Sequence, residues 1–182
     1  MREGRSRGDF PLSRFCGSVP KSRYSSSQMM RFVIALLAVT GAWGQSLEVT
    51  ASAVDRGSAN IFRILLKLDA GEEPTALQWE LAVPAQITIE VSGMVTGDAA
   101  ERAGKSLTCA AKKSEGAARI FACVLAGGLK AIPAGTIAIV RYEAAAKASP
   151  GKVTVRLEKA VGVSADLKKV AVSSGTGVIT IR

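Results

Sequence analysis

The sequence predicts an all-β protein, folded as a two-sheet antiparallel β-sandwich of about nine strands. Two observations support this prediction. Apolar and polar residues alternate along short segments throughout residues 45–182, and a period of two places successive side chains on opposite faces of a sheet. Turn-forming residues separate these segments at short, regular intervals, which is typical of sandwiches and barrels.

The expected strands follow one another along the chain, and each has an apolar set that would face the core. They cover residues 47–53, 62–68, 77–81, 87–91, 107–112, 119–125, 138–144, 153–157 and 178–181. A short additional strand is expected at 169–172. Gly, Pro, Asp and Ser fill the connections, as in Asp55–Gly57 and Ser149–Gly151. The exception is residues 98–105, where a short helical turn is expected.

Residues 1–28 are expected to form a disordered leader. They are rich in Arg, Ser, Gly and Pro and show no apolar periodicity. Such a segment cannot bury enough apolar surface to fold. The simplest interpretation is that translation begins at Met29 or Met30 and that residues 1–28 lie upstream of the true start.

Residues 29–44 have the pattern of a secretory signal peptide. A basic start precedes the short apolar core Phe32–Val39, and small residues follow at Ala42 and Gly44. The core is shorter than the roughly 20 residues that a membrane span needs, and an uncleaved signal anchor is the alternative. Cleavage after Gly44 would leave residues 45–182 as one secreted domain, extracellular or periplasmic, with no stable membrane span.

The charge of the chain argues against nucleic-acid binding. The full sequence carries a formal net charge of +9, but residues 45–182 hold 17 Lys and Arg against 13 Asp and Glu, a net charge of +4. These charges alternate in sign and are scattered along the domain. A phosphate-binding surface would need a basic stripe or patch instead.

The residue types also argue against an enzyme. The chain has no His, which removes the commonest general base and metal ligand at neutral pH. A glycosidase would need two facing acids. Glu80 and Glu90 lie on neighbouring expected strands, but the alternation already explains both as solvent-exposed residues. No Asp-x-Asp pattern suggests a calcium loop. We therefore expect no catalytic residues, no cofactor and no metal.

Two cysteines in the expected domain, Cys109 and Cys123, are predicted to form a disulfide. A turn signal at Ser114–Gly116 lies midway between them, so a hairpin would place the two opposite each other. Export to an oxidising compartment favours the bond. Closing a loop of this size contributes roughly 3 kcal/mol in the chain-entropy model. The alternative is a pair of buried free thiols.

The segment 118–125 differs from the other expected strands because both of its faces are apolar. Phe121 and Cys123 belong to one face, and Ile120 and Val124 belong to the other. Either the domain covers this central strand on both sides, or one face is exposed and docks a partner. Our hypothesis is that Ile120 and Val124 belong to a partner-binding face.

Trp79 could in principle stack on a sugar ring. It shares its parity with Leu77 and Leu81, however, and the period of two therefore places it in the core. Tyr142 is expected to face inward for the same reason, together with Ala138 and Val140.

Four segments, taken in order, resemble a cohesin domain. The first is residues 62–68 followed by 75–81, which resemble the second strand of the family and the strand after it. The others are the apolar run ending in Gly at 87–97, the Gly-x-Ile-Ala strand at 133–142, and the closing pair 151–158 and 177–181. The resemblance covers nearly all of residues 45–182. It implies a jelly-roll sandwich that binds a protein partner, typically a dockerin, in assemblies that degrade polysaccharides.

The sequence thus predicts a secreted, non-catalytic cohesin-like module that docks a dockerin-like protein in polysaccharide degradation or cell-surface assembly. The alternative is a carbohydrate-binding module of the same fold, whose partner would be a polysaccharide. A third possibility is a subunit of a surface fibre, which would need an unpaired edge strand.

Overall fold

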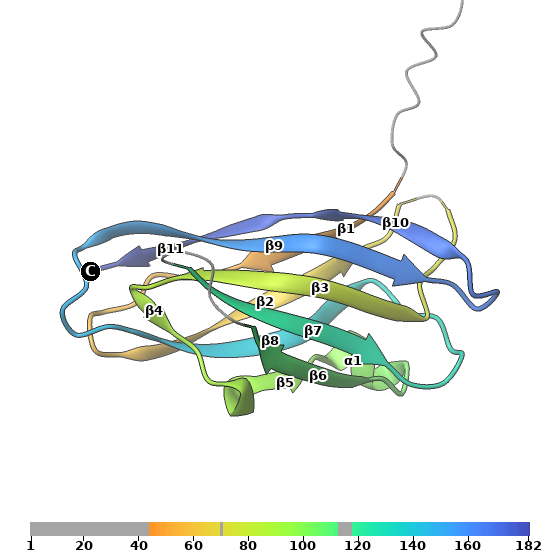
Figure 1. Ribbon diagram of the computed structural model, residues 1–182, viewed down its shortest axis with the longest axis horizontal. Coiled ribbons are helices and arrows are strands. Elements are labelled where there is room, and N and C mark those ends of the chain that lie inside the picture. Colours follow the sequence, from red (N-terminus) through yellow and green to blue (C-terminus); the bar gives the residue numbers. More distant parts are fainter. Residues whose placement is uncertain (1–43, 70, 113–117) are drawn as a thin grey trace, which may run out of the picture. The chain divides into compact units, whose positions relative to one another are not determined.

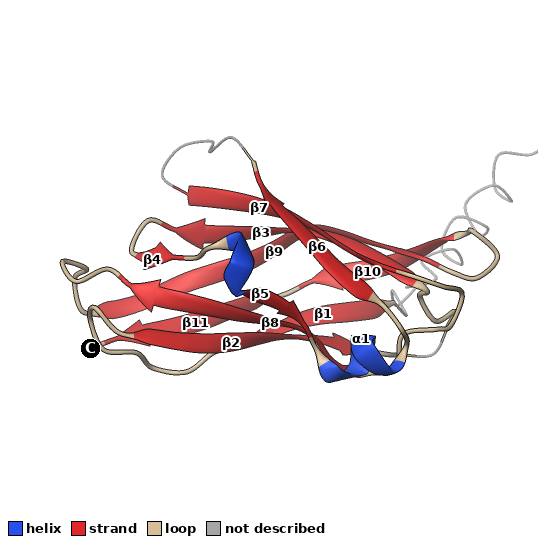
Figure 2. Cartoon of the chain, turned by 90° about the horizontal axis from the view of Figure 1, so that it is seen from below, coloured by secondary structure: helices blue, strands red, loops and turns tan. Residues whose placement is uncertain are grey.

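The computed structural model describes residues 44–69, 71–112 and 118–182. They form a β-sandwich, as the alternation predicts (Figure 1, Figure 2). The expected leader at 1–28, the expected signal peptide up to residue 43 and the hairpin turn Ser114–Gly116 lie outside the described residues.

The described residues contain eleven strands rather than about nine: the short additional strand expected at 169–172 is present, and a further short strand at 94–96 was not expected. The strands are β1 Gln45–Thr50, β2 Ala59–Lys67, β3 Ala76–Pro84, β4 Ile87–Thr88, β5 Met94–Thr96, β6 Ser106–Ala111, β7 Ala118–Ala126, β8 Gly135–Ala144, β9 Gly151–Val163, β10 Lys169–Ser174 and β11 Thr176–Ile181. The helical turn expected at 98–105 is confirmed as α1, Asp98–Arg102.

The strands make two layers that meet along one side. In the first layer β8 pairs with β2, β2 pairs with β1, and the short strands β4 and β5 pair with β8. In the second layer the order is β6, β7, β3 and β9, and β10 and β11 pair with the far side of β9. β1 pairs with β10 in parallel and joins the layers. All other pairs of named strands are antiparallel.

The core lies between the two layers and consists of the inward-facing apolar set. Trp79 and Tyr142 are both in it, with exposed fractions of 0% and 1%, as their parity predicts. The Tyr142 hydroxyl donates a hydrogen bond to the Ser52 carbonyl at 3.1 Å, so its polar atom is satisfied. Burying each large apolar side chain contributes about 1.5–3 kcal/mol, and this apolar set therefore holds the layers together.

One expected strand is wrong over part of its length. The alternation at 87–91 predicts a continuous strand, but β4 ends at Thr88 and a 3₁₀ turn follows at Val91–Gly93. Ile89 is still buried, whereas Val91 is 41% exposed. The chain leaves the sheet here and returns to β8 as β5, which leaves a gap in the edge of the layer.

The closing strand depends on a glycine. A Cβ atom at Gly177 would collide with the side chain of Val49 on β1. The missing side chain therefore lets β11 pass close to β1 while it pairs with β9. Among the described residues, no helix is both long and apolar enough to cross a membrane.

Candidate functional site

The outer surface of β6, β7, β3 and β9 forms one of the two broad faces of the sandwich, and we call it the front face. Its outward side chains are those that alternate with the buried set: Gln78, Glu80, Ala82, Thr108, Ala110, Lys112, Ile120, Ala122, Val124, Arg156 and Glu158. Because β7 lies between β3 and β6, its outward residues occupy the middle of the face.

The two sequence-predicted partner residues lie on this strand and point outward. On β7 the alternate residues Phe121, Cys123 and Leu125 are buried, whereas Val124 is 43% exposed and Ile120 is half-buried. The domain therefore covers only one side of β7. The outer side presents branched apolar side chains to solvent, and their role in partner binding stays a prediction.

Small side chains keep the centre of the front face shallow. Ala110 on β6 pairs with Ala122 on β7, and Ala122 in turn pairs with Glu80 on β3. Val124 and Ile120 lie on either side of this row along β7. An exposed apolar surface with a flat centre and a polar surround is typical of a protein-docking surface.

Glu80 is the polar centre of the front face, and sequence reasoning placed it incorrectly. It is only 9% exposed rather than solvated. The ammonium group of Lys112 lies 2.7 Å from Glu80 Oε1, and that of Lys159 lies 3.0 Å from Oε2. The hydrogen bonds from Lys112 and then from Lys159 hold the pKa of Glu80 below its ordinary value. Glu80 is thus an ionised, paired group.

The two lysines come from different neighbouring strands. Lys112 follows β6, and Lys159 lies at an irregularity in β9, where its φ of 52° turns it out of the regular register. No local pattern in the sequence brings them to Glu80. The two lysines reach Glu80 because β3 pairs with β9 and because β7 lies between β3 and β6.

Cys109 and Cys123 form a disulfide across the β6–β7 hairpin. The residues are direct partners in the register, and their Cα atoms lie 4.1 Å apart. Cys123 is also the direct partner of Trp79 on β3, so the disulfide belongs to the inward side of the layer. It ties the edge strand β6 to the strand that carries Ile120 and Val124.

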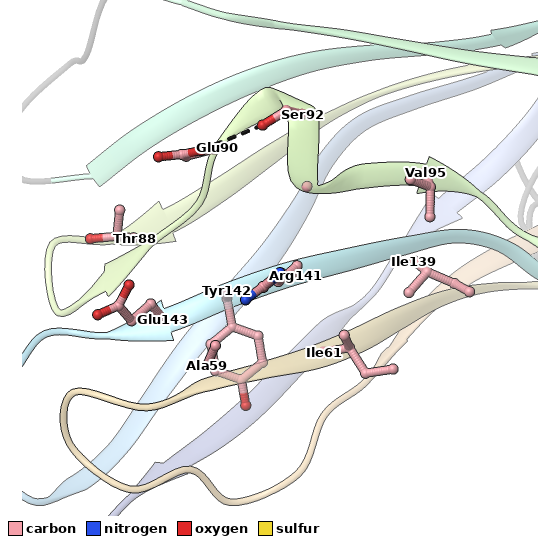
Figure 3. Close-up of a pocket in the computed structure, with 11 residues that line it drawn as sticks. Ala59, Ile61, Thr88, Glu90, Ser92, Val95, Ile139, Arg141, Tyr142 and Glu143 are labelled. Carbon is pink, nitrogen blue, oxygen red and sulfur yellow. Dashed lines mark hydrogen bonds between the residues drawn. The ribbon is translucent and has the colours of Figure 1, made fainter.

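The opposite broad face contains a half-open groove of about 590 Å³ over β2 and β8 (Figure 3). Ile61, Val95 and Ile139 supply its apolar lining, and Glu90, Arg141 and Glu143 supply charge, together with five further lining residues: Ala59, Thr88, Ser92, Gly93 and Tyr142. The groove lies beside the 3₁₀ turn where the chain leaves the sheet. Its volume therefore comes from the interrupted strand that the alternation did not predict.

Aromatic side chains do not form a sugar platform on the described part of the domain. Phe62, Trp79, Phe121 and Tyr142 are the aromatic residues of this part, and none is more than 4% exposed. Tyr142 contributes to the groove lining, but its ring is buried. A glycan would therefore find no exposed aromatic ring on the described surface to stack against.

The acidic side chains of the two faces have different surroundings. Both Glu80 oxygens are held by lysines, and Glu90 accepts a hydrogen bond from the Ser92 hydroxyl at 3.4 Å. Within the described ranges, no three His, Cys, Asp or Glu residues are grouped so that they could hold a metal ion. The described surface offers contact areas, the groove over β2 and β8, and a second hollow of about 420 Å³ that Ile120 helps to line.

No family model matches the sequence, and no curated protein matches it either. Solved structures do share the fold. A non-cellulosomal cohesin from the archaeon Archaeoglobus fulgidus superposes with a TM-score of 0.60 at 13% identity, covering 76% of this chain and 91% of that one. The sixth cohesin of scaffoldin B from Acetivibrio cellulolyticus, solved with a mutant Cel5 dockerin, gives 0.60 at 14% identity, covering 76% and 99%.

A third similar structure is the Coh-OlpA–Doc918 complex, a type I cohesin–dockerin complex from Clostridium thermocellum. It superposes with a TM-score of 0.59 at 14% identity and covers 75% of this chain and 99% of the other. The expected resemblance to cohesins is therefore confirmed at the level of fold, over about three quarters of the chain.

Proposed function

We propose that this domain is a secreted, non-catalytic docking module that binds a dockerin-like protein through its front face. The proposal rests on one observation: on the outer side of β7, next to the edge strand β6, Val124 is exposed and Ile120 is half-exposed. Burying such residues in a monomer would be favourable, and an exposed apolar strip in the middle of a sheet usually marks an interaction surface.

The composition of the front face supports a protein ligand. Its outward side chains along β7 are apolar, Lys112, Arg156 and Glu158 surround them with charge, and the buried carboxylate of Glu80 is paired with two lysines. Arg156 Nε lies 3.1 Å from Glu158 Oε1, and the two side chains are 57% and 39% exposed. An apolar centre inside a polar rim is the usual anatomy of a protein–protein interface. Two of the cohesins with this fold were solved with dockerins bound, which favours the same class of partner.

A direct binding measurement tests the proposal. The chain would be titrated with a panel of dockerins, including those of the two complexes named above, by calorimetry. Replacing one central apolar residue, Val124→Asp, should weaken the best binder about 100-fold, because a buried hot-spot residue contributes 2 kcal/mol or more. Val95→Asp is the matched control, since Val95 is 49% exposed but lies over the groove on the opposite face.

The result that would overturn the proposal is equally specific. If Val95→Asp abolishes binding and Val124→Asp does not, the docking surface is the groove and not the front face. If no dockerin binds, capture of partners from the native secretome with the wild-type chain and the Val124→Asp variant asks whether another protein uses the same face. Binding only to cellulose or chitin on a glycan array would favour the carbohydrate-binding alternative.

A further inference from the structure

The two most exposed large apolar side chains of the described residues lie at loop tips. Leu129 is 74% exposed in the loop between β7 and β8, and Leu167 is 82% exposed in the turn between β9 and β10. The other large apolar side chains with substantial exposure, such as Val95 and Val178, reach at most 49%. Two leucines of this kind call for an explanation beyond the ordinary scatter of single surface residues.

Both loops lie at the same end of the sandwich. β9 ends at Val163, which pairs with Ala76 at the start of β3. The loop before β3 is tied to the other loop, since Ile132 N donates to the Pro74 carbonyl at 2.9 Å. We call this the β2–β3 end; Figure 1 shows it on the right, opposite the C-terminus. The loops that carry Leu129 and Leu167 therefore lie at the same end, on either side of the β2–β3 loop.

The leucine tips are held in place. The Lys105 ammonium donates hydrogen bonds to the carbonyls of Gly127 and Gly128, at 2.5 and 3.0 Å, and so anchors the loop just before Leu129. In the other turn, Leu167 N donates to the Ser164 carbonyl at 3.1 Å, and Ser164 N donates to the Lys168 carbonyl at 2.9 Å. These bonds fix the loops from which the two leucines project.

Leu167 is also in an unfavourable backbone conformation. Its φ is 59°, in the left-handed region that glycine and asparagine adopt far more easily than a branched apolar residue. A leucine in this position neither fills the core nor relaxes the turn. Backbone strain combined with exposure points to a role outside the folding of the domain.

The chain enters the domain at this same end. The Gln45 side chain, at the start of β1, accepts a hydrogen bond from Asp69 N at 2.9 Å and donates to the Glu72 carbonyl at 3.4 Å, both in the loop before β3. The start of β1 is therefore tied to the same β2–β3 loop that the β7–β8 loop contacts.

We propose that the β2–β3 end is a lipid-facing surface, in which Leu129 and Leu167 insert into the outer part of a bilayer. Each leucine is followed by lysine, at Lys130 and at Lys168, whose stem can lie along apolar groups while the charge stays in the headgroup layer. Two separate tips suit a fluid lipid surface better than the flat surface of a folded protein.

The driving force is apolar insertion and not charge attraction. Asp166, whose Oδ2 lies 3.8 Å from Lys168 Nζ, and Glu72 and Glu73 of the β2–β3 loop offset the charges of Lys130, Lys168 and Lys169. The contact should therefore form on neutral lipid, persist at high salt and gain nothing from anionic lipid, unlike a polybasic membrane site.

The test places a reporter at each tip of the full chain. Leu129→Trp and Leu167→Trp are mixed with phosphatidylcholine vesicles whose acyl chains carry bromine, a short-range quencher of indole fluorescence. Lys147→Trp, in the exposed turn between β8 and β9 at the opposite end, is the control. The emission of the parent chain, which holds Trp43 and Trp79, is subtracted from each variant.

The added indoles at positions 129 and 167 should be quenched at least twofold more than the indole at 147, in neutral vesicles and at both low and high salt. The proposal is overturned if the indoles at both ends are quenched equally, or if the indole is quenched at neither position 129 nor position 167. Either result overturns it even if these loops prove to bind a protein. A contact that appears only with anionic lipid, or that vanishes in salt, overturns the apolar mechanism.

Discussion

The two broad faces of the sandwich arise from the same alternation but have become different surfaces. On the front face the rows run without a break across β6, β7 and β3, the register shifts once between β3 and β9, and the charge of Glu80 is neutralised by two lysines. The opposite face is interrupted at the 3₁₀ turn and opens into a groove. There, Glu90, Arg141 and Glu143 form no ion pair with any described residue.

This difference shows that strand continuity, more than composition, determines what a sheet face can do. An unbroken row of paired strands presents apolar side chains in register, so they form a flat contact surface. A strand that leaves the sheet exposes the floor beneath it, and the charged groups around the gap stay solvated. The following substitutions test the contrast between the two faces.

The largest effect is expected from removing the disulfide that supports the front face. Replacing both cysteines, Cys109→Ser and Cys123→Ser, should lower the free energy of unfolding by about 3 kcal/mol, because the bond closes a loop with a sequence separation of 14. Denaturant unfolding measures the loss. Hydrogen exchange should quicken in β6 and β7 more than in β2 and β8, and a uniform increase would contradict the local role.

The next effect is a pH dependence that belongs to Glu80. Its pKa is lowered in the folded state from an ordinary value of 4.5. Ionised Glu80 therefore contributes stability above pH 4.5, and that contribution is lost as the pH falls through the folded-state pKa. Glu80→Gln should flatten this part of the stability profile, measured by thermal unfolding between pH 3 and pH 7.

Glu143→Gln provides the matched control for this profile, because Glu143 lies on the groove face and forms no ion pair within the described residues. The stability of the Glu143→Gln variant at the acidic end of the pH range should follow that of the wild-type chain. If Glu80→Gln also leaves the acid limb unchanged, the two lysines do not stabilise the folded state through Glu80.

A smaller effect, of opposite sign, is expected at the strained turn. Leu167→Gly should raise the free energy of unfolding by about 0.5–1 kcal/mol, since relief of the left-handed conformation exceeds the entropic cost of glycine. Lys159→Gly relieves a similar conformation but removes an ion pair to Glu80, so it should give no gain. Equal gains at both positions would show that the Lys159–Glu80 pair is not stabilising.

The smallest effect is expected from Arg141→Ala in the groove. Exposed side chains without ion pairs usually contribute within about 0.5 kcal/mol, so the stability should hardly change. Affinity for a front-face partner should not change at all, as calorimetry would show. A loss of affinity comparable to that of Val124→Asp would mean that the two faces are coupled.

The sequence predicted the elements that depend on local parity. Trp79 and Tyr142 alternate with apolar neighbours, and both are in the core. Ile120 and Val124 oppose a buried set, and both point outward. The prediction of a strand at 87–91 is wrong after Thr88, because the apolar–polar alternation continues after the chain has left the sheet. Ile89 is still buried in the core, whereas Val91 is exposed.

What depended on contacts between distant segments could not be predicted. The Glu80 network joins Lys112 and Lys159, whose positions follow from which strands flank β3 and from an irregularity in β9. The parallel pairing of β1 with β10 and the groove beside the 3₁₀ turn have no periodic signal either. The exposure of Leu129 and Leu167 could not be predicted either, because a single leucine in a loop belongs to no periodic pattern that indicates whether it is buried.

The placement of β11 has a consequence for how the domain is made. Val54 N donates to the Thr180 carbonyl at 2.9 Å, and Arg182 N donates to the Val54 carbonyl at 3.0 Å, so the segment around β11 closes onto the segment that follows β1. Contacts of such long sequence separation form slowly. The sandwich can therefore close only after β11 has been synthesised.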